Sequence, residues 1–234
     1  MHGGLALVIG AQGALGAACA ALLDADTTCG AVLRLSRSSF PALDYADESS
    51  FVTAAQWVQA ECARRNIPLR CVIVATGTLH NAAGQPERSW SNIDTAYLQH
   101  VFQVNAIGPA LVVKHFAPLL PKTGRVTMAC LSAKVGSIGD NALGGWYGYR
   151  ASKAALNQLV KTAAIELTRC NKDSVCVALH PGTVDSALSQ PFAKTGLNVR
   201  SPDVAAGELL GVLQGLGAAD TGKFFDYQGR ELPW

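Results

Sequence analysis

Short apolar segments alternate with helical patterns along this chain, and the alternation restricts the fold more than any other feature of the sequence. The segment 5–9, Leu-Ala-Leu-Val-Ile, is typical, because it has the length and apolar character of a parallel strand buried on both faces. Strands that alternate with helices predict a parallel sheet wrapped by helices on both faces. The strand candidates are 4–9, 31–36, 71–76, 125–131, 174–180 and 222–227, and helical patterns lie near 14–24, 47–65, 94–120, 148–170 and 202–215.

Length and composition fit a single α/β domain that spans residues 1–234. Hydrophobic residues make up 49% of the chain and charged residues 15%, which suits a well-packed core. The formal net charge of +2 favours neither nucleic acid nor a membrane surface as a partner. No apolar stretch reaches the roughly 18 residues of a membrane span, and the first residues lack the pattern of a secretory signal. We therefore expect a cytoplasmic protein with no nucleic-acid or membrane partner.

Cysteine and histidine spacing argues against a metal site. The seven cysteines are scattered and form no C-x-x-C pair, and the five histidines show no H-E-x-x-H spacing. We expect reduced thiols, several of them buried in strands as small hydrophobic side chains.

A glycine-rich turn follows the first strand directly. The sequence Gly10-Ala11-Gln12-Gly13-Ala14-Leu15-Gly16 leads into an alanine-rich stretch that favours helix. A strand, a glycine turn and a helix in this order bind phosphate, because glycine lets the backbone approach and the helix amino terminus offers free N–H groups. The glycines recur every third residue, which departs from G-x-G-x-x-G, and a plain tight turn is the ordinary alternative. The flanking strand and helix favour a dinucleotide pyrophosphate.

Tyr149 and Lys153 are spaced four residues apart at the start of a helical pattern. Residues with this spacing share one helical face, so the ammonium of Lys153 can lie near the phenol of Tyr149. A positive charge at that position is expected to lower the tyrosine pKa from about 10 toward the range useful for proton transfer. Taken alone, the pair also fits a half-buried tyrosine beside a solvated lysine.

Together the two motifs resemble the short-chain dehydrogenase/reductase family, and the resemblance runs from Leu5 to Trp234. It is strongest to the branch that includes the bacterial C-factor and the sniffer-type carbonyl reductases, through segments 132–141, 144–157, 180–185 and 229–234. The resemblance implies a Rossmann fold with a doubly wound parallel sheet of about seven strands. The seventh strand would lie around 42–45.

The residues after the second strand indicate the cofactor. A chain that prefers NAD usually carries an acidic residue there, which holds the adenosine ribose. Here the strand ends in Ser36-Arg37-Ser38-Ser39 without an acid. The planar guanidinium of Arg37 suits the additional phosphate of NADP, although an exposed loop arginine is the ordinary alternative. We therefore expect NADPH in preference to NADH.

The family resemblance implies further cofactor contacts. Asp44 matches an aspartate that contacts adenine, Gly77 matches a glycine that leaves room for a ribose, and 181–184 match a turn that contacts the nicotinamide carboxamide and the phosphates. The full expected set is Gly10, Gln12, Gly13, Ala14, Leu15, Gly16, Ser36, Arg37, Asp44, Ala75, Thr76, Gly77, Asn105, Tyr149, Lys153, Pro181, Gly182, Thr183 and Val184.

The resemblance also implies catalytic roles. Tyr149 would donate a proton to the carbonyl oxygen of the substrate, and Lys153 would hold the nicotinamide ribose and lower the tyrosine pKa. Asn105 would kink its helix and hold a water in a proton relay toward the lysine. An amide bonded to nearby backbone is the ordinary alternative for Asn105, because asparagine is mildly unfavourable within a helix.

Ser132 occupies the first of two adjacent serine positions in relatives, and Ala133 occupies the second, which usually donates to the substrate carbonyl. Three alternatives follow: Ser132 rotates into the role, Ser137 supplies the hydroxyl, or Tyr149 works with less help. A missing donor of this kind costs about 3–4 kcal/mol of transition-state stabilisation if nothing replaces it.

We therefore predict an NADPH-dependent oxidoreductase that reduces a ketone or aldehyde and assembles as a homodimer or homotetramer. The segment 183–201 would cover the substrate, and Trp146 would line the pocket or simply pack; the tail 232–234 is expected at a subunit interface. A dihydropteridine reductase-like enzyme and a dinucleotide-binding signalling protein of C-factor type remain alternatives. A serine hydrolase is disfavoured, because Ser132 lies in no G-x-S-x-G elbow.

Overall fold

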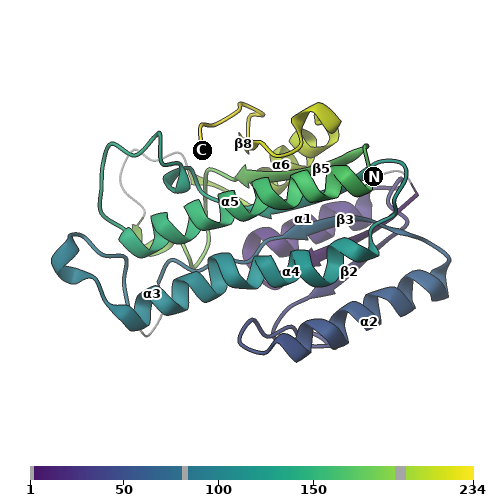
Figure 1. The fold of residues 1–234 in the computed structure, drawn as a ribbon, viewed down its shortest axis with the longest axis horizontal. Coiled ribbons are helices and arrows are strands. Elements are labelled where there is room, and N and C mark those ends of the chain that lie inside the picture. Colours follow the sequence, from purple (N-terminus) through teal and green to yellow (C-terminus); the bar gives the residue numbers. More distant parts are fainter. Residues whose placement is uncertain (1–2, 81–83, 193–198) are drawn as a thin grey trace.

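The computed structural model of the chain describes residues 3–80, 84–192 and 199–234, and six parallel strands form its main sheet (Figure 1). The strand order is β2-β1-β3-β4-β5-β8, with every neighbouring pair parallel. This order, with crossovers on both sides of β1, is that of a Rossmann-like sheet. The strands are β1 (Leu5–Ile9), β2 (Ala31–Leu35), β3 (Leu69–Val74), β4 (Val126–Leu131), β5 (Ser174–His180) and β8 (Phe224–Asp226).

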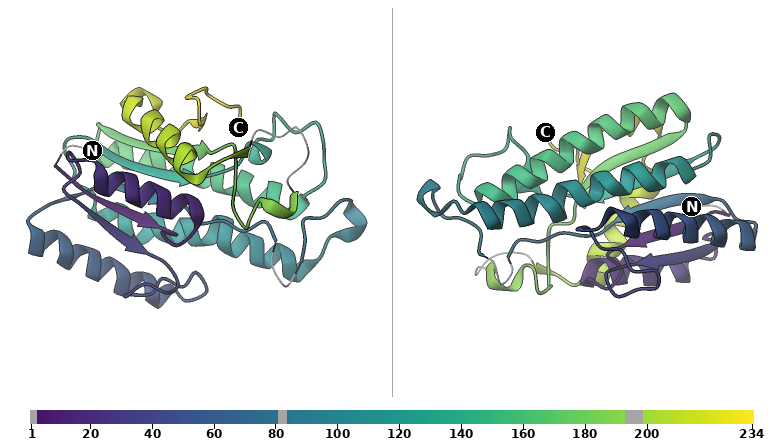
Figure 2. Two further views of the ribbon diagram at one scale, coloured as in Figure 1. Left: turned by 180° about the vertical axis from the view of Figure 1, so that it is seen from behind. Right: turned by 60° about the horizontal axis from the view of Figure 1, so that its bottom comes forward.

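Helices cover both faces of this sheet. On one face α1 (Ala14–Ala25) packs against α6 (Pro202–Gly215), which the view from behind shows (Figure 2). On the other face lie α2 (Glu48–Arg65), α4 (Gly108–Phe116) and α5 (Tyr147–Cys170), with α3 (Thr95–Phe102) leading into α4. The predicted doubly covered sheet is therefore confirmed. The shorter helical turns are Trp90–Asn92, Gln103–Ile107, Ala117–Leu119, Lys134–Gly136, Gln190–Phe192 and Ala218–Asp220.

Alternation along β1 shows how the sequence produces two cores. Leu5, Leu7 and Ile9 point into the cluster under α2, α4 and α5, whereas Ala6 and Val8 point into the cluster under α1 and α6. Successive strand residues face opposite sides, so a strand covered on both faces must be apolar throughout.

The predicted seventh strand around 42–45 is wrong. The N–H of Leu43 donates back to the carbonyl of Ser36 at 2.9 Å, and the side chain of Asp44 accepts from the N–H of Ala46 at 2.9 Å. These bonds fold the segment into a loop against the end of β2, so its backbone groups are not available for a sheet ladder. The described residues instead contain a two-stranded pair that was not predicted, β6 (Thr183–Val184) with β7 (Val199–Arg200).

The predicted continuous helix over 94–120 is also interrupted. Gln103–Ile107 forms a π turn between α3 and α4, and a 3₁₀ turn follows α4. Single π turns inside helices are rare and frequently mark functional sites.

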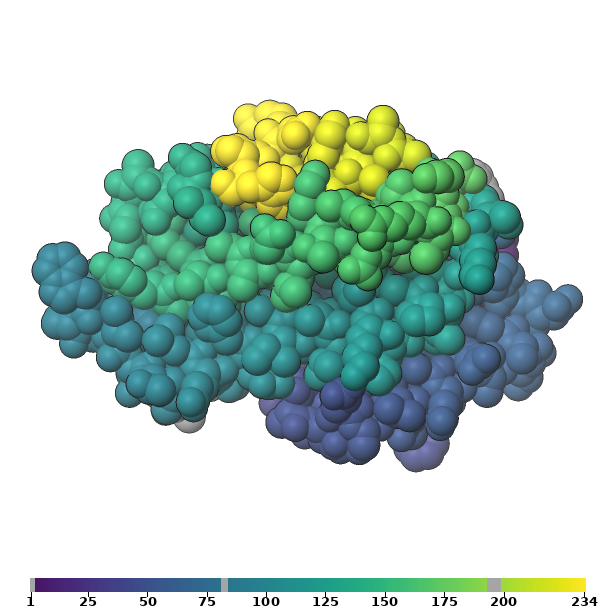
Figure 3. Space-filling model, viewed as in Figure 1, coloured from purple at the N-terminus to yellow at the C-terminus, as the bar shows by residue number. Residues whose placement is uncertain are grey.

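The carboxy-terminal tail packs on its own chain. Trp234 stacks on Phe224 with ring centroids 5.8 Å apart, and its carbonyl accepts from the N–H of Gly139 at 3.0 Å. On the face in Figure 3 the carboxy-terminal part of the chain, in yellow, lies beside α5. The expected role of this tail at a subunit interface remains a prediction.

Across 3–80, 84–192 and 199–234, no helix combines the length and apolar character needed to cross a membrane. The same residues contain no group of three or more histidine, cysteine or carboxylate side chains that could hold a metal ion. The cysteines are unpaired, and Cys71, Cys130 and Cys176 lie buried within β3, β4 and β5.

Candidate active site

The turn between β1 and α1 is packed so closely that two of its glycines are required. A Cβ on Gly16 would lie 2.2 Å from the carbonyl oxygen of Gly10, and Gly10 itself has a φ of +84°. Helix α1 begins after Gly13 with no side-chain cap and no acidic residue in its first turn. The N–H groups of the first turn of α1 therefore have no side-chain acceptor from a cap or from an acidic residue of that turn, and such free N–H groups suit an anionic phosphate.

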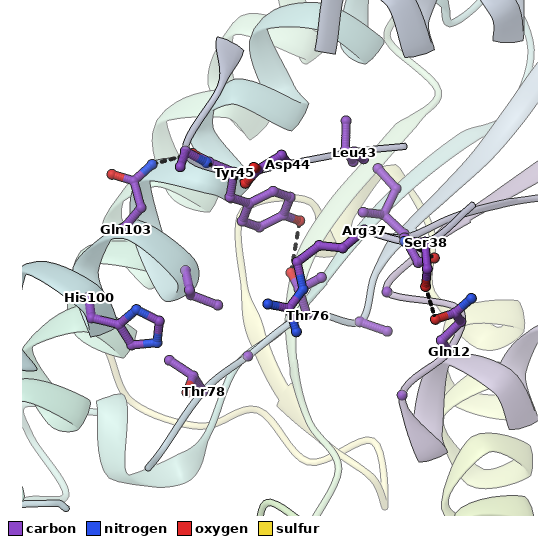
Figure 4. Close-up of a pocket in the computed structure, with 18 of the residues that line it drawn as sticks. Gln12, Arg37, Ser38, Leu43, Asp44, Tyr45, Thr76, Thr78, His100 and Gln103 are labelled. Atoms are coloured by element: carbon purple, nitrogen blue, oxygen red, sulfur yellow. Dashed lines mark hydrogen bonds between the residues drawn. The ribbon is translucent and has the colours of Figure 1, made fainter. Parts of the chain in front are cut away.

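A cavity of about 730 Å³ opens at the carboxyl ends of β1, β2 and β3 (Figure 4); we call it the β1–β3 cavity. Nucleotides bind at this edge of open α/β sheets. The predicted cofactor residues that line it are Gly10, Gln12, Gly13, Ser36, Arg37, Asp44, Ala75, Thr76 and Gly77. Its other lining residues, which sequence reasoning missed, are Ile9, Ser38, Leu43, Tyr45, Ala46, Thr78, His80, His100, Gln103 and Val104. The predicted residues outside its lining are Ala14, Leu15, Gly16, Asn105, Tyr149, Lys153, Pro181, Gly182, Thr183 and Val184.

Arg37 extends into the β1–β3 cavity in Figure 4. Its side chain is exposed, and among the described residues no hydrogen bond or ion pair engages its guanidinium. The neighbouring Ser38 hydroxyl donates to the side-chain oxygen of Gln12, which ties the end of β2 to the glycine turn. An unpaired guanidinium on a cavity wall fits a phosphate ligand.

Tyr45 connects the loop after β2 with the loop after β3 and with the helical segment around Gln103 and Gly108. Its hydroxyl lies 2.9 Å from the hydroxyl of Thr76, and its carbonyl accepts from the side-chain amide of Gln103. The ring lies so close to α4 that a Cβ on Gly108 would come within 1.8 Å of it. Burial raises the pKa of the Tyr45 phenol, so the group stays neutral.

Asn105 sits in the π turn and is fully buried. Its Oδ1 accepts from the N–H of Thr78 at 2.8 Å, and its Nδ2 donates to the carbonyl of Thr78 at 2.9 Å and to Ser152 Oγ at 3.0 Å. The amide is thus bonded to nearby backbone, which was the ordinary alternative. The expected break in the helix is present, whereas the water relay remains a prediction.

Tyr149 and Lys153 lie on one face of α5 and are both buried. The Nζ of Lys153 donates to the carbonyl of Leu131 at 2.9 Å, at the end of β4. A Cβ on Gly77 would lie 3.4 Å from Lys153 Nζ and 3.6 Å from Asn105 Oδ1. Gly77 lines the β1–β3 cavity and lies close to both side chains, although neither side chain lines the cavity itself; together with Tyr149 we call Lys153 and Asn105 the α5 site.

Burial dominates the ionisation of the α5 site. It raises the pKa of Tyr149, with a smaller contribution from Tyr97, and lowers the pKa of Lys153 to about 8. Burial is therefore the dominant influence on the tyrosine pKa in this arrangement, and its lowering by Lys153 remains a prediction. Desolvation disfavours the charged form of each group, and the ammonium is directed at a backbone carbonyl.

The two serine hydroxyls considered as replacements for Ala133 are engaged inside the protein. Ser132 donates to the side-chain oxygen of Asn157 at 2.7 Å. Ser137 donates to the carbonyl of Trp234 at 3.3 Å and accepts from the N–H of Asp140 at 3.1 Å. Of the three alternatives, this arrangement favours Tyr149 working with less help.

Arg200 and Tyr227, which form a cation–π contact with each other, pack against the expected nicotinamide turn 181–184. The Arg200 guanidinium lies 3.5 Å from the ring centroid of Tyr227 and forms an ion pair with Glu208 at 3.1 Å. A Cβ on Gly182 would come within 2.6 Å of the Arg200 guanidinium. Glycine at position 182 therefore lets the turn lie close to Arg200, and its φ of +73° also favours glycine.

A series of ring contacts leads from Tyr149 through Trp146 to Phe192 and His80. The ring of Trp146 lies 6.1 Å from that of Tyr149 and 5.3 Å from that of Phe192, and His80 lies 5.6 Å from Phe192. Trp146 thus packs against its aromatic neighbours, and its expected place in the lining of the substrate pocket remains a prediction. Residues 193–198 of the predicted covering segment lie outside the described residues.

Comparison with known proteins identifies the family. The profile described as enoyl-(acyl carrier protein) reductase matches residues 73–199, which is more than half of the chain. The "C-signal" protein of Myxococcus xanthus is 37% identical over 143 residues, covering 61% of this chain and 82% of that protein. The chain belongs to the short-chain dehydrogenase/reductase family. A second member, a 1-hydroxy-2-glutathionyl-2-methyl-3-butene dehydrogenase from Rhodococcus sp. strain AD45, is 32% identical over 61% of each chain.

Solved structures agree on the short-chain dehydrogenase/reductase fold. An NADPH-bound carbonyl reductase from chicken fatty liver gives a TM-score of 0.86 at 23% identity, and the carbonyl reductase Sniffer of Drosophila melanogaster gives 0.84 at 19%, each with full coverage of both chains. A family member from Burkholderia multivorans with bound NADP gives 0.77 at 25% identity and 99% coverage of both chains.

The sequence did not reveal two residues of this chain that connect distant segments around the site, Tyr45 and Glu87. Tyr45 directly follows Asp44, and its only signal in the sequence was an aromatic residue in a polar loop. Glu87 is buried without lying in any recognised motif, so nothing in the sequence pointed to it. Both act across long sequence distances, which local patterns do not encode.

Proposed function

We propose that this protein is an NADPH-dependent carbonyl reductase that reduces a ketone or aldehyde. The observation that carries the proposal is the position of Gly77. It lines the β1–β3 cavity and also lies against Lys153 Nζ, so a dinucleotide in that cavity would reach the α5 site. The residues present fit such a ligand at both ends, with a glycine turn and helix amino terminus at one and a buried tyrosine and lysine at the other.

Two features support NADPH over NADH. Arg37 lines the cavity with a guanidinium that no described residue engages, and Ser36 and Ser38 lie beside it. The Burkholderia multivorans relative with bound NADP supports the same choice.

NADPH, when bound, supplies the hydride that adds to the carbonyl carbon. Tyr149 would supply the proton to the carbonyl oxygen, since its phenol is protonated at neutral pH and lies on the face of α5 that also carries Lys153. Lys153, with a pKa lowered to about 8, is still mostly charged at pH 7 and would hold the ribose hydroxyls. Asn105 keeps the Thr78 backbone and Ser152 in place, and Ser152 in turn donates to the carbonyl of Tyr149 at 2.9 Å.

The proposal extends to surroundings and partners. The substrate is a small carbonyl compound, and the protein works in the cytoplasm as a homodimer or homotetramer. The 37% identity to the C-signal protein supports a second candidate, a dinucleotide-binding signalling protein in which turnover matters little. A dihydropteridine reductase-like activity is the remaining alternative.

A binding titration with NADPH and NADH, followed by an NADPH-oxidation screen, tests these functions. The screen spans aldehydes, ketones, diketones, quinones and a quinonoid dihydropterin. Tight NADPH binding with turnover of ordinary carbonyl compounds would support the reductase. Turnover of the pterin alone would favour the dihydropteridine reductase, and binding without any turnover would favour the signalling protein. Weak binding of both dinucleotides would overturn all three.

A further inference from the structure

The amino terminus of α5 lacks a cap of its own. The residue before the helix, Trp146, makes no capping hydrogen bond with its side chain, and the first turn contains no acidic residue. Trp146 also adopts a left-handed conformation with a φ of 54°, which is uncommon outside glycine, asparagine and aspartate. The turn that carries Tyr149 therefore depends on some other part of the chain to hold it.

That support comes from Glu87, 61 positions earlier in the sequence. Both of its carboxylate oxygens accept from the N–H of Gly148, at 3.2 and 3.0 Å. Its backbone carbonyl accepts from the N–H of Trp146 at 2.5 Å. The residue is only 2% exposed, so the carboxylate meets the helix amino terminus with little water between them. A negative charge at this end of a helix is stabilised by the helix dipole and by the free N–H groups.

The fit around Glu87 is tight. A Cβ on Gly148 would lie 3.0 Å from the Glu87 Oε1 and 3.0 Å from the Leu98 Cδ2 on α3. Gly148 thus lets α5 approach α3 closely enough for the carboxylate to reach its backbone. Tyr149 is the next residue along the helix, so a shift of this turn would move the phenol as well.

We propose that Glu87 is a positioning residue for the chemistry proposed above, because its buried carboxylate holds the first turn of α5 and thereby places the Tyr149 phenol. The catalytic part of this inference rests on the proposed function. The holding of the helix does not, because the hydrogen bonds exist whatever the reaction.

Hydrogen exchange measures the holding directly. In Glu87→Ala the backbone amide of Gly148 loses its acceptor, and its exchange should become faster than in the wild-type protein. Glu87→Gln keeps one acceptor oxygen without the charge and should give a smaller increase. An unchanged exchange rate at Gly148 in Glu87→Ala would overturn the proposal.

Turnover measures the consequence. With saturating NADPH and a carbonyl substrate, Glu87→Ala should lower kcat by about 10- to 100-fold, the scale of a displaced catalytic group. The Kd for NADPH should stay within about 3-fold, because Glu87 lies outside the β1–β3 cavity. Glu87→Gln should recover part of the lost kcat, which a purely structural defect would not predict.

Asp47→Ala provides the matched control. Asp47 caps α2 through the N–H of Ser49 at 2.9 Å, and it lies outside the lining of the β1–β3 cavity. Its loss should lower thermal stability to a similar extent and leave kcat unchanged. Equal losses of kcat in both variants, or wild-type kcat in Glu87→Ala, would overturn the positioning role. Tyr149→Phe, measured alongside, separates the two ideas: wild-type turnover there would defeat the proposed function alone.

Discussion

The β1–β3 cavity and the α5 site meet at Gly77, but the chain builds them in different ways. The cavity is shaped by a contiguous glycine turn and by loop residues such as Arg37, whose guanidinium stays open to a ligand. In the α5 site the polar groups are buried, and Lys153 and Asn105 are bonded to β4, to the loop after β3 and to α5. Residues close together in the sequence can thus form much of a binding surface, whereas the α5 site needs residues from distant segments.

Tyr149→Phe tests the separation most strongly, because it removes the proton donor and leaves the cavity intact. We expect turnover to fall by about 10²–10⁴-fold. NADPH affinity, measured by titration, should stay within a few-fold of wild type. Near-normal turnover would show that the α5 site does not perform the chemistry.

Arg37→Ala makes the opposite change. If the guanidinium binds the additional phosphate, its loss should weaken NADPH binding by about 10- to 100-fold, the scale of a charge-assisted hydrogen bond. NADH binding should hardly change. Arg34→Ala is the control, because Arg34 lies on β2, three residues before Arg37, but pairs with Asp24 and does not line the cavity. Equal weakening for both dinucleotides would refute the phosphate role of Arg37.

Gly108→Ala tests how closely α4 packs against Tyr45, which lines the β1–β3 cavity. The added methyl group would come within 1.8 Å of the Tyr45 ring, so we expect a loss of about 1–3 kcal/mol in the free energy of unfolding. Gly211→Ala in α6 is the matched control, since its Cβ would meet nothing within 4 Å. That control should be stabilised by about 0.5–1 kcal/mol in urea unfolding. A neutral Gly108→Ala variant would mean that Tyr45 is free to move.

The smallest expected effect concerns the burial of Lys153, which lowers the pKa of its side chain from the ordinary 10.5 to about 8. Between these values the unfolded chain binds more protons at this residue than the folded one, so its contribution to stability rises with pH. From pH 7 to 9 the stability difference between wild type and Lys153→Met should shift by about 1 kcal/mol in favour of wild type. Urea unfolding at both pH values, without dinucleotide, measures it; a constant difference would mean that the ammonium is well solvated.

Local features of the sequence predicted most of the fold. The expected helix over 202–215 matches α6, and the expected strand over 174–180 matches β5, because each is set by its own apolar pattern and flanking residues. The glycine turn and Arg37 were likewise recognised from their immediate neighbours in the sequence, and both line the β1–β3 cavity; their contacts with a cofactor remain predictions. The predicted strand at 42–45 failed because a hydrogen bond from Leu43 back to Ser36 decides that segment.

The parts of the site that sequence could not provide depend on contacts between distant residues. Tyr45 contacts Gly108, and Glu87 caps the helix at Gly148. The pKa of Tyr149 also depends on distant residues, because the parts of the chain that bury its phenol raise the pKa despite a lysine one helical turn away. A spacing of four residues shows that two side chains share a face but not how dry that face is.

The Asn105 amide bears on how this protein can change over evolutionary time. One side chain joins the π turn, the loop after β3 and α5, so a substitution there would alter all of them together. Trp146, which contacts the Tyr149 ring, and Phe192, which contacts Trp146, take no part in those hydrogen bonds. A substitution at Trp146 or Phe192 can therefore alter the surroundings of Tyr149 without breaking the hydrogen bonds that hold Asn105.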